Sequence, residues 1–299
     1  MARPTPFLFC RYSLARNDIQ LSAAEQLRLL NEVRGIVVAY RKTDPADDDR
    51  DTFAMKPTSF RIGHRVILVW HVGYYVGLRS EAEYNQNDDD IIESLVATNG
   101  IKHTKFVAVP DLGRLAVQDQ TGDTHLNGAS GISRFKTIAR SIPGVRADIE
   151  LAASNQDVMS ALNVWSIEQF TFNLRPFNPT PRRMGRILGK LFTDNDIGKL
   201  RGVAQPSYGH YIHNPSEGFV GEAVGLTSAG YGQITLKGKT PSGQQASFGK
   251  PAFSESRDEN ERSQAKPRSL RVYFEDCDTD KELNSAVAQS LIDLYAPQA

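Results

Sequence analysis

The sequence predicts an α+β protein with a largely antiparallel sheet and flanking helices, because two periodicities are mixed along it. Residues 65–72 and 165–174 are rich in β-branched and aromatic residues, and the second segment alternates with the strand period of two. Residues 180–192 and 279–295 instead repeat apolar residues at helical spacing. The order of strands and helices that precedes residue 180 is typical of an α+β domain.

Length and composition favour two domains of ordinary size. The chain has 299 residues, with 35 Lys and Arg against 35 Asp and Glu, so its formal net charge is zero. Any contact with nucleic acid must therefore come from local segregation of charge. Cys10 and Cys277 lie far apart, which suits a reducing compartment, and no apolar run is long enough to span a membrane. We expect a cytoplasmic protein without direct membrane insertion, divided into residues 1–176 and 177–299.

The first expected domain mixes strand hairpins with helices. Residues 22–25 form a capping box that begins a helix, and Gly73 is expected to separate two strands. Asp88, Asp89 and Asp90 could bind a metal ion, but they also suit the N-terminus of a helix, where negative charge is favoured. The expected elements are strands at 7–13, 36–40, 65–72, 74–78, 106–110, 115–118, 145–152 and 165–174, and helices from Ser22 and at 91–98, 131–142 and 155–162.

The second expected domain, residues 177–299, differs in style. Residues 205–230 are rich in Gly, Tyr and Ser and predict irregular or edge-strand structure. Strands are expected at 233–237 and 270–274, separated by a polar, mobile loop at 240–269. A capping box at 279–282 begins a C-terminal helix over 279–295.

The helix at 180–192 has two faces of different character. Thr180 is a suitable N-cap and Pro181 suits the first helical position. Its apolar stripe consists of Met184, Ile187, Leu188 and Leu191, and its other side carries Arg182, Arg183, Arg186 and Lys190. A stripe of cations without an acid can bind phosphates, although a basic helix face is more often simply solvated.

Further cations and aromatic residues extend this hypothesis. Lys199 and Arg201 follow the basic helix, and the helix at 131–142 is expected to present Arg134, Lys136 and Arg140 outward. Tyr208, Tyr211, Phe219 and Tyr231 could stack on bases or pack in the core. Lys237 and Lys239 belong to a second basic region around the polar loop. Because phosphate contacts carry no base information, the pattern predicts salt-sensitive, sequence-independent DNA binding.

No motif for catalysis is found, so no catalytic residue, cofactor or metal ligand is predicted. The phosphate-binding loop and dinucleotide-binding glycine patterns are missing from the sequence. His210 and His213 with Glu217 or Glu222 form at most a partial metal set. Two alternatives stay open: a metal-dependent nuclease that uses carboxylates such as Asp148 and Glu150, and a protein-interaction module with residues 205–230 and the loop at 240–269 as docking elements.

Several short motifs resemble known proteins. Residues 4–7, 11–12, 177–181, 197–201 and 231–235 resemble an uncharacterised family of bacterial and prophage proteins of roughly this length. More distantly, the layout over residues 106–200 resembles RexA-like proteins of the lambda-type Rex phage-exclusion system. That resemblance implies a homodimeric DNA-binding protein of anti-phage defence that acts with a small membrane-protein partner. No family motif maps functional residues onto this chain.

Overall fold

The structure, a computed structural model, divides the chain into two compact units. It describes residues 4–40, 51–85, 90–176, 186–208, 210–212, 218–249, 269–275 and 277–296, with the backbone alone considered for 77–85, 90–99, 186 and 228. Unit 1 comprises residues 1–11, 112–116 and 149–299, and unit 2 comprises residues 12–111 and 117–148. The expected boundary at residue 176 lies inside unit 1, because the chain passes between the units several times.

The fold is α+β with antiparallel sheet pairing, as the sequence predicts. Where the register between two named strands is defined, the pair is antiparallel. The helices are α1 (Ala23–Glu32), α2 (Gly128–Arg140), α3 (Asn155–Val164), α4 (Arg186–Asp194), α5 (Gly218–Ser228) and α6 (Asp280–Tyr295). Among the described helices, none is long and apolar enough to cross a membrane.

In unit 1 the strands form an antiparallel sheet in the order β12, β11, β10, β8, β9. Their bounds are β8 Ser166–Leu174, β9 Leu200–Ala204, β10 Gly232–Lys239, β11 Gln245–Phe248 and β12 Leu270–Phe274. The start of β1 (Thr5–Arg16) pairs with β12 on the far side. Consequently β9 ends this order, and β10 and β8 lie in its middle.

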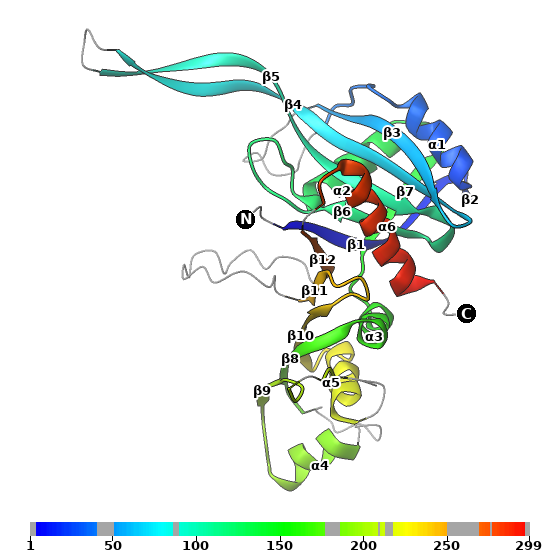
Figure 1. Ribbon diagram of the computed structural model, residues 1–299, viewed down its shortest axis with the longest axis vertical. Coiled ribbons are helices and arrows are strands. Elements are labelled where there is room, and N and C mark those ends of the chain that lie inside the picture. The colour runs from blue at the N-terminus through cyan, green and yellow to red at the C-terminus, as the bar shows by residue number, and fades with distance from the viewer. Residues whose placement is uncertain are drawn as a thin grey trace. The chain divides into compact units, whose positions relative to one another are not determined.

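Helices of unit 1 cover one face of this sheet. Phe219 of α5 packs edge-on against Phe172 of β8, with ring centroids 4.8 Å apart. Gly202 of β9 lies on the same face, because a Cβ built there would meet the Phe172 ring at 2.5 Å. The helix α5 contacts β8 and β10, while α3 and α6 contact β12 and each other. Figure 1 shows α3 and α5 beside β8 and β10.

A buried carboxylate ties several elements of unit 1 together. Asp157 in the first turn of α3 is fully buried and forms ion pairs with Arg11 (3.2 Å) and Arg114 (3.1 Å). Ser154 and the Tyr295 hydroxyl also donate hydrogen bonds to it. Burial, together with the negative charge of Asp157, raises the pKa of Tyr295, so this hydroxyl stays a donor. The network therefore connects β1, β6, α3 and α6.

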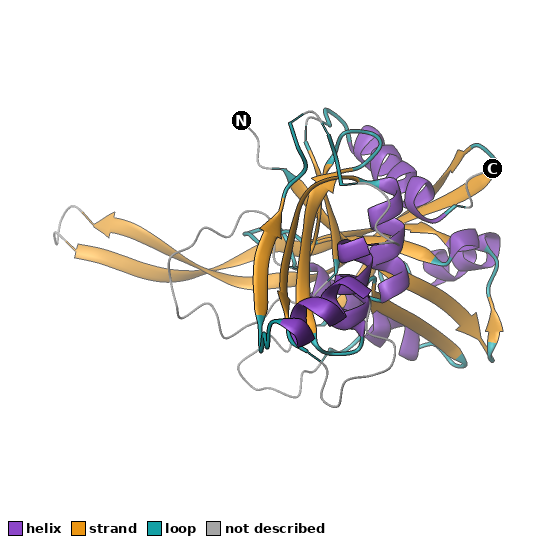
Figure 2. Cartoon of the chain, turned by 90° about the horizontal axis from the view of Figure 1, so that it is seen from below, coloured by secondary structure: helices purple, strands orange, loops and turns teal. Residues whose placement is uncertain are grey.

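Unit 2 is built on a long hairpin. Its strands include β2 (Ile19–Gln20), β3 (Thr52–Ile62), β4 (Arg65–Asn85) and β5 (Asp90–Val109), while β6 (Arg114–Gln118) and β7 (Val145–Leu151) pass between the units. The helices α1 and α2 contact β3 and β4, and the ring of Phe135 packs on Trp70 and Phe106. Figure 2 shows β4 and β5 as a two-stranded ribbon that extends past the end of β3.

The capping boxes predicted at Ser22 and Thr279 are confirmed, but two predictions in the long hairpin are wrong. Gly73 separates no strands, because β4 runs through it, and a Cβ there would meet the carbonyl of Lys102 at 2.5 Å. The glycine thus permits a close approach of β5. Residues 91–98 form strand rather than helix, since β5 pairs with β4 from Asp90 onward. Asp88 and Asp89 lie outside the described residues.

Two further expectations fail in unit 1. The segment predicted as irregular at 205–230 contains α5, which is stabilised by burying Ala223, Val224 and Leu226 rather than by local propensity. The expected loop at 240–269 contains β11, paired between β10 and β12. Residues 250–268 of that loop lie outside the described part of the chain.

Candidate nucleic-acid interface

The face of β8, β9 and β10 opposite α5 is polar and cationic, and we call it the open face. Phe170, Phe172 and Leu236 point toward the helices. Because side chains alternate along a strand, the residues between them point to the open face. The open face consists of Gln169, Thr171 and Asn173 on β8, Arg201 and Val203 on β9, and Gln233, Thr235, Lys237 and Lys239 on β10. Arg201, Val203 and Gln233 are exposed, and the others are half-buried.

The strand register brings cations and amides of the open face into rows across the sheet. Asn173 pairs with Arg201 on one side and with Gln233 on the other. Gln169 pairs with Lys237 in a second row. Two more exposed cations flank these rows: Lys199 directly precedes β9, and Arg175 follows β8, its amide donating to the carbonyl of Tyr231 at 2.8 Å. The face thus offers several positive charges within one small area.

Glu168 is the only acidic residue of these three strands, and it neutralises one of the cations. Its carboxylate lies 3.1 Å from Nζ of Lys239. The hydrogen bond and the charge of Glu168 raise the pKa of Lys239, so this amine stays protonated. Both side chains are about two-fifths exposed, and a pair of this kind is easily displaced by another anion.

Tyr211 adds an aromatic ring beside this ion pair. The amide of Ile212 donates to the carbonyl of Ile167 at 3.1 Å, which places the segment alongside β8. Ile167 points to the helix side, so the residue before Ile212 points to the open face. Tyr211 is 40% exposed and lies near Lys239, whose pKa its phenol helps to raise.

One polar atom of the open face lacks a protein partner. The Oδ1 atom of Asn173 is buried without a hydrogen bond. Leaving a buried acceptor without a hydrogen bond costs about 1–3 kcal/mol. For this reason nearly all buried acceptors in folded proteins are bonded, and Asn173 is an exception.

The structure brings together only part of the sequence-predicted cationic set. Lys190 on α4, Lys199 and Arg201 are exposed in unit 1, as expected for phosphate contacts. Arg182 and Arg183 lie outside the described residues, and Arg186 begins α4 without a described side chain. The described part of the expected basic helix is α4, from Arg186 to Asp194.

The prediction that Arg134 faces outward is wrong. Arg134 is 2% exposed, and its guanidinium lies 4.1 Å and 4.2 Å from the ring centroids of Tyr40 and Tyr74. It faces inward because these rings offer cation–π contacts and the stem packs in the core. Lys136 is half-buried, and Arg140 is exposed at the last residue of α2. These residues belong to unit 2, whereas the open face belongs to unit 1.

Other residues weighed from the sequence have local roles. Glu222 caps α4 from α5, accepting hydrogen bonds from the amides of Ile187 and Leu188. Asp148 pairs with Arg146 at 2.8 Å. His210 is exposed, whereas His213 and Glu217 lie outside the described residues. Phe219 packs on the helix-covered side of the sheet, so of the two roles considered for it, base stacking and core packing, the second is confirmed.

Sequence reasoning missed a row of histidines in unit 2. The rings of His71, His103 and His125 lie edge to face, with centroids 5.2 Å and 5.8 Å apart. Burial, with the charge of Lys105, lowers the pKa of His125, which is therefore neutral near pH 7. The three residues are far apart in sequence, so only strand pairing reveals the row.

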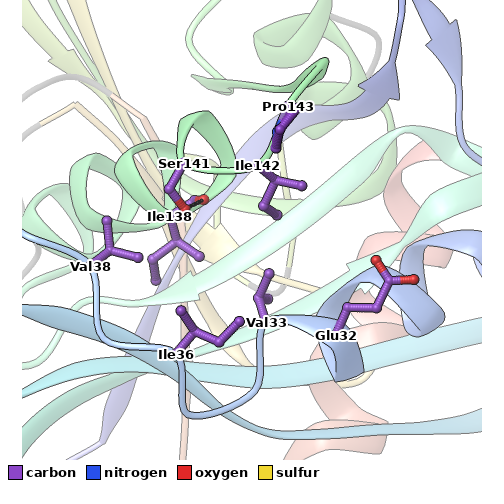
Figure 3. Close-up of a pocket in the computed structure, with 8 residues that line it drawn as sticks. All are labelled: Glu32, Val33, Ile36, Val38, Ile138, Ser141, Ile142 and Pro143. Atoms are coloured by element: carbon purple, nitrogen blue, oxygen red, sulfur yellow. Dashed lines mark hydrogen bonds between the residues drawn. The ribbon is translucent and has the colours of Figure 1, made fainter.

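A small pocket of about 260 Å³ lies at the ends of α1 and α2 in unit 2 (Figure 3). Its walls are mostly apolar, formed by Val33, Ile36, Val38, Ile138, Ile142 and Pro143, with Glu32 and Ser141 as the polar members. Binding sites for small molecules usually present several convergent polar groups. This pocket therefore offers less chemistry than the open face.

The fold and the open face define a class of protein: an α+β protein with an antiparallel sheet that is helix-covered on one face and cationic on the other. Comparison with family models gives no match for the chain, and comparison with curated proteins gives no significant match. The open face is therefore the feature of the molecule from which a function can be inferred.

Proposed function

We propose that the chain binds nucleic acid, DNA in the first instance, without base specificity through the open face of unit 1. The observation that supports this proposal is the register that places Arg201, Lys237 and Lys239 on one sheet face, with Arg175 and Lys199 at its margin. Clustered Lys and Arg attract a phosphate backbone and release its counterions.

The chemistry of the face supports sequence-independent binding. Phosphate contacts by Lys and Arg carry no base information. The side-chain amides of Gln169, Asn173 and Gln233 each contain a donor and an acceptor, so they can pair with many base edges. Because the chain has no net charge, attraction acts only close to this face.

The test is the binding of purified protein to labelled DNA of unrelated sequences, measured by fluorescence anisotropy at several salt concentrations. If Arg175, Lys199, Arg201 and Lys237 each contact a phosphate, log K should fall with log salt with a slope of about −3 to −4. Similar affinities for unrelated sequences are expected. The absence of binding at low salt would overturn the proposal, and magnesium-dependent cleavage would replace it with the nuclease alternative.

Glu168→Gln is expected to tighten binding. The substitution removes the carboxylate that neutralises Lys239 and frees a cation on the open face. One additional phosphate contact should strengthen binding about fivefold at 0.1 M salt and steepen the salt slope by about 0.7–0.9. Weaker or unchanged binding would show that Lys239 does not meet the ligand. Glu32→Gln on α1 is the control, because it makes the same change at another exposed ion pair, with Arg16, outside the open face.

The cellular role proposed with this activity is phage exclusion or abortive infection. It rests on the resemblance of residues 106–200 to RexA-like proteins. A homodimer and a small membrane-protein partner have the same basis and stay predictions.

A further inference from the structure

We infer that the nucleic acid bound by the open face is single-stranded, with Tyr211 as a stacking platform beside the cations. This inference deepens the proposed function and rests on it. It depends on the width of the sheet, the place of the aromatic ring and the amides between the cations.

The width of the sheet argues against reading a duplex through its grooves. The major groove of B-DNA is about 12 Å wide and admits a helix or a two-stranded ribbon. The strands β12, β11, β10, β8 and β9 lie side by side, and four spacings of about 4.8 Å make this sheet about 19 Å wide. Because β11 and β12 continue the sheet beyond the open face, the sheet is broader than the groove and would meet a duplex along the backbone, whereas a single strand can lie across the face with its bases turned toward the protein.

The residues of the open face suit such a strand. Tyr211 is half-exposed beside the Glu168–Lys239 ion pair, so a base stacked on its ring would have its phosphate close to a cation. Asn173 lies between Arg201 and Gln233, and its buried Oδ1 lacks a partner. The side-chain amide of Gln233 is exposed, so it can form hydrogen bonds with the edge of an unpaired base, whereas base pairing and stacking in a duplex hold these edges away from the sheet.

The first arm of the experiment compares ligands. Single-stranded DNA, single-stranded RNA and duplex DNA of equal length and mixed sequence are titrated with the full chain at equal salt. We expect both single strands to bind at least about tenfold more tightly than the duplex. Duplex DNA that binds as well as the single strands would overturn this inference while leaving nucleic-acid binding intact. If none of the three binds at low salt, the proposed function itself fails.

The second arm tests the ring. Tyr211→Ala should weaken single-strand binding at least about fivefold without changing the salt slope, because stacking releases no counterions. Tyr211→Phe should retain most of the affinity. Tyr208→Ala is the matched control, because this fully exposed tyrosine lies three residues earlier, outside the strand pairing that places Tyr211. Equal losses for Tyr208→Ala and Tyr211→Ala, or no loss for either, would contradict the stacking role.

Discussion

Replacing both Arg201 and Lys237 with glutamate should weaken nucleic-acid binding by at least about 25-fold at 0.1 M salt. Each phosphate contact on a single strand contributes about 0.7 log units at that concentration, so two lost contacts give this factor, and reversed charge adds repulsion. The salt slope should become shallower by about 1.4 for single strands. Anisotropy titrations over a salt series measure both quantities.

The control for this double variant tests whether the position of the cations matters or only the net charge of the protein. Arg140→Glu with Lys136→Glu changes charge equally on α2, whose cations the sequence also proposed as contacts. If the open face is the interface, the α2 variant should bind nearly as well as the unchanged protein. Should the α2 variant lose affinity and the sheet variant keep it, the interface lies in unit 2 and our assignment is wrong. Circular dichroism verifies that both variants are folded.

Asp157→Asn should lower the free energy of unfolding by about 3–5 kcal/mol. The substitution removes the buried charge that pairs with Arg11 and Arg114, leaving two guanidinium groups beside a neutral amide. Typical domains have only 5–15 kcal/mol of stability, so the loss should be readily visible in urea unfolding. We expect a shift in the midpoint and an unchanged slope if the native surface stays the same.

The stability control is the same chemical change at a surface ion pair of unit 1. Glu168→Gln removes a carboxylate that pairs with Lys239, and both side chains are about two-fifths exposed, so the expected cost is below about 1 kcal/mol. Equal midpoints for Asp157→Asn and Glu168→Gln would mean that the buried network contributes no more than a surface pair. Nucleic-acid binding provides a second contrast, because only the Glu168 variant should bind more tightly.

Local signals in the sequence were sufficient for two capped helix starts and for strands with a clear period-two pattern or β-rich composition. The capping boxes at Ser22 and Thr279 predicted the starts of α1 and α6, since a cap is formed by residues three positions apart. Strands β8, β10 and β12 were predicted from alternation and composition. Helix α5 was missed because its glycines disfavour a helix locally and its apolar side chains are stabilised by the sheet.

In the candidate site, too, the sequence indicated individual residues but not which of them lie together. Arg201 and Lys199 were proposed from their sequence, and the alternation in β8 and β10 already contained Gln169, Asn173 and Gln233 as a polar set. The alternation does not reveal which strands are neighbours. The same limit applies to Arg134: its helical position suggested exposure to solvent, but the rings of Tyr40 and Tyr74, from distant parts of the sequence, lie against its guanidinium.

The sequence by itself determined the α+β class, the caps of α1 and α6 and the cations available for a phosphate ligand, because each depends on residues close along the chain. Tertiary structure alone decided which cations share a surface, since the pairing of β8 with β9 and β10 joins Arg201, Asn173 and Lys237 across long stretches of sequence. It also decided that Arg134 is buried and that Asp157 holds two arginines, because burial depends on which elements pack around a side chain.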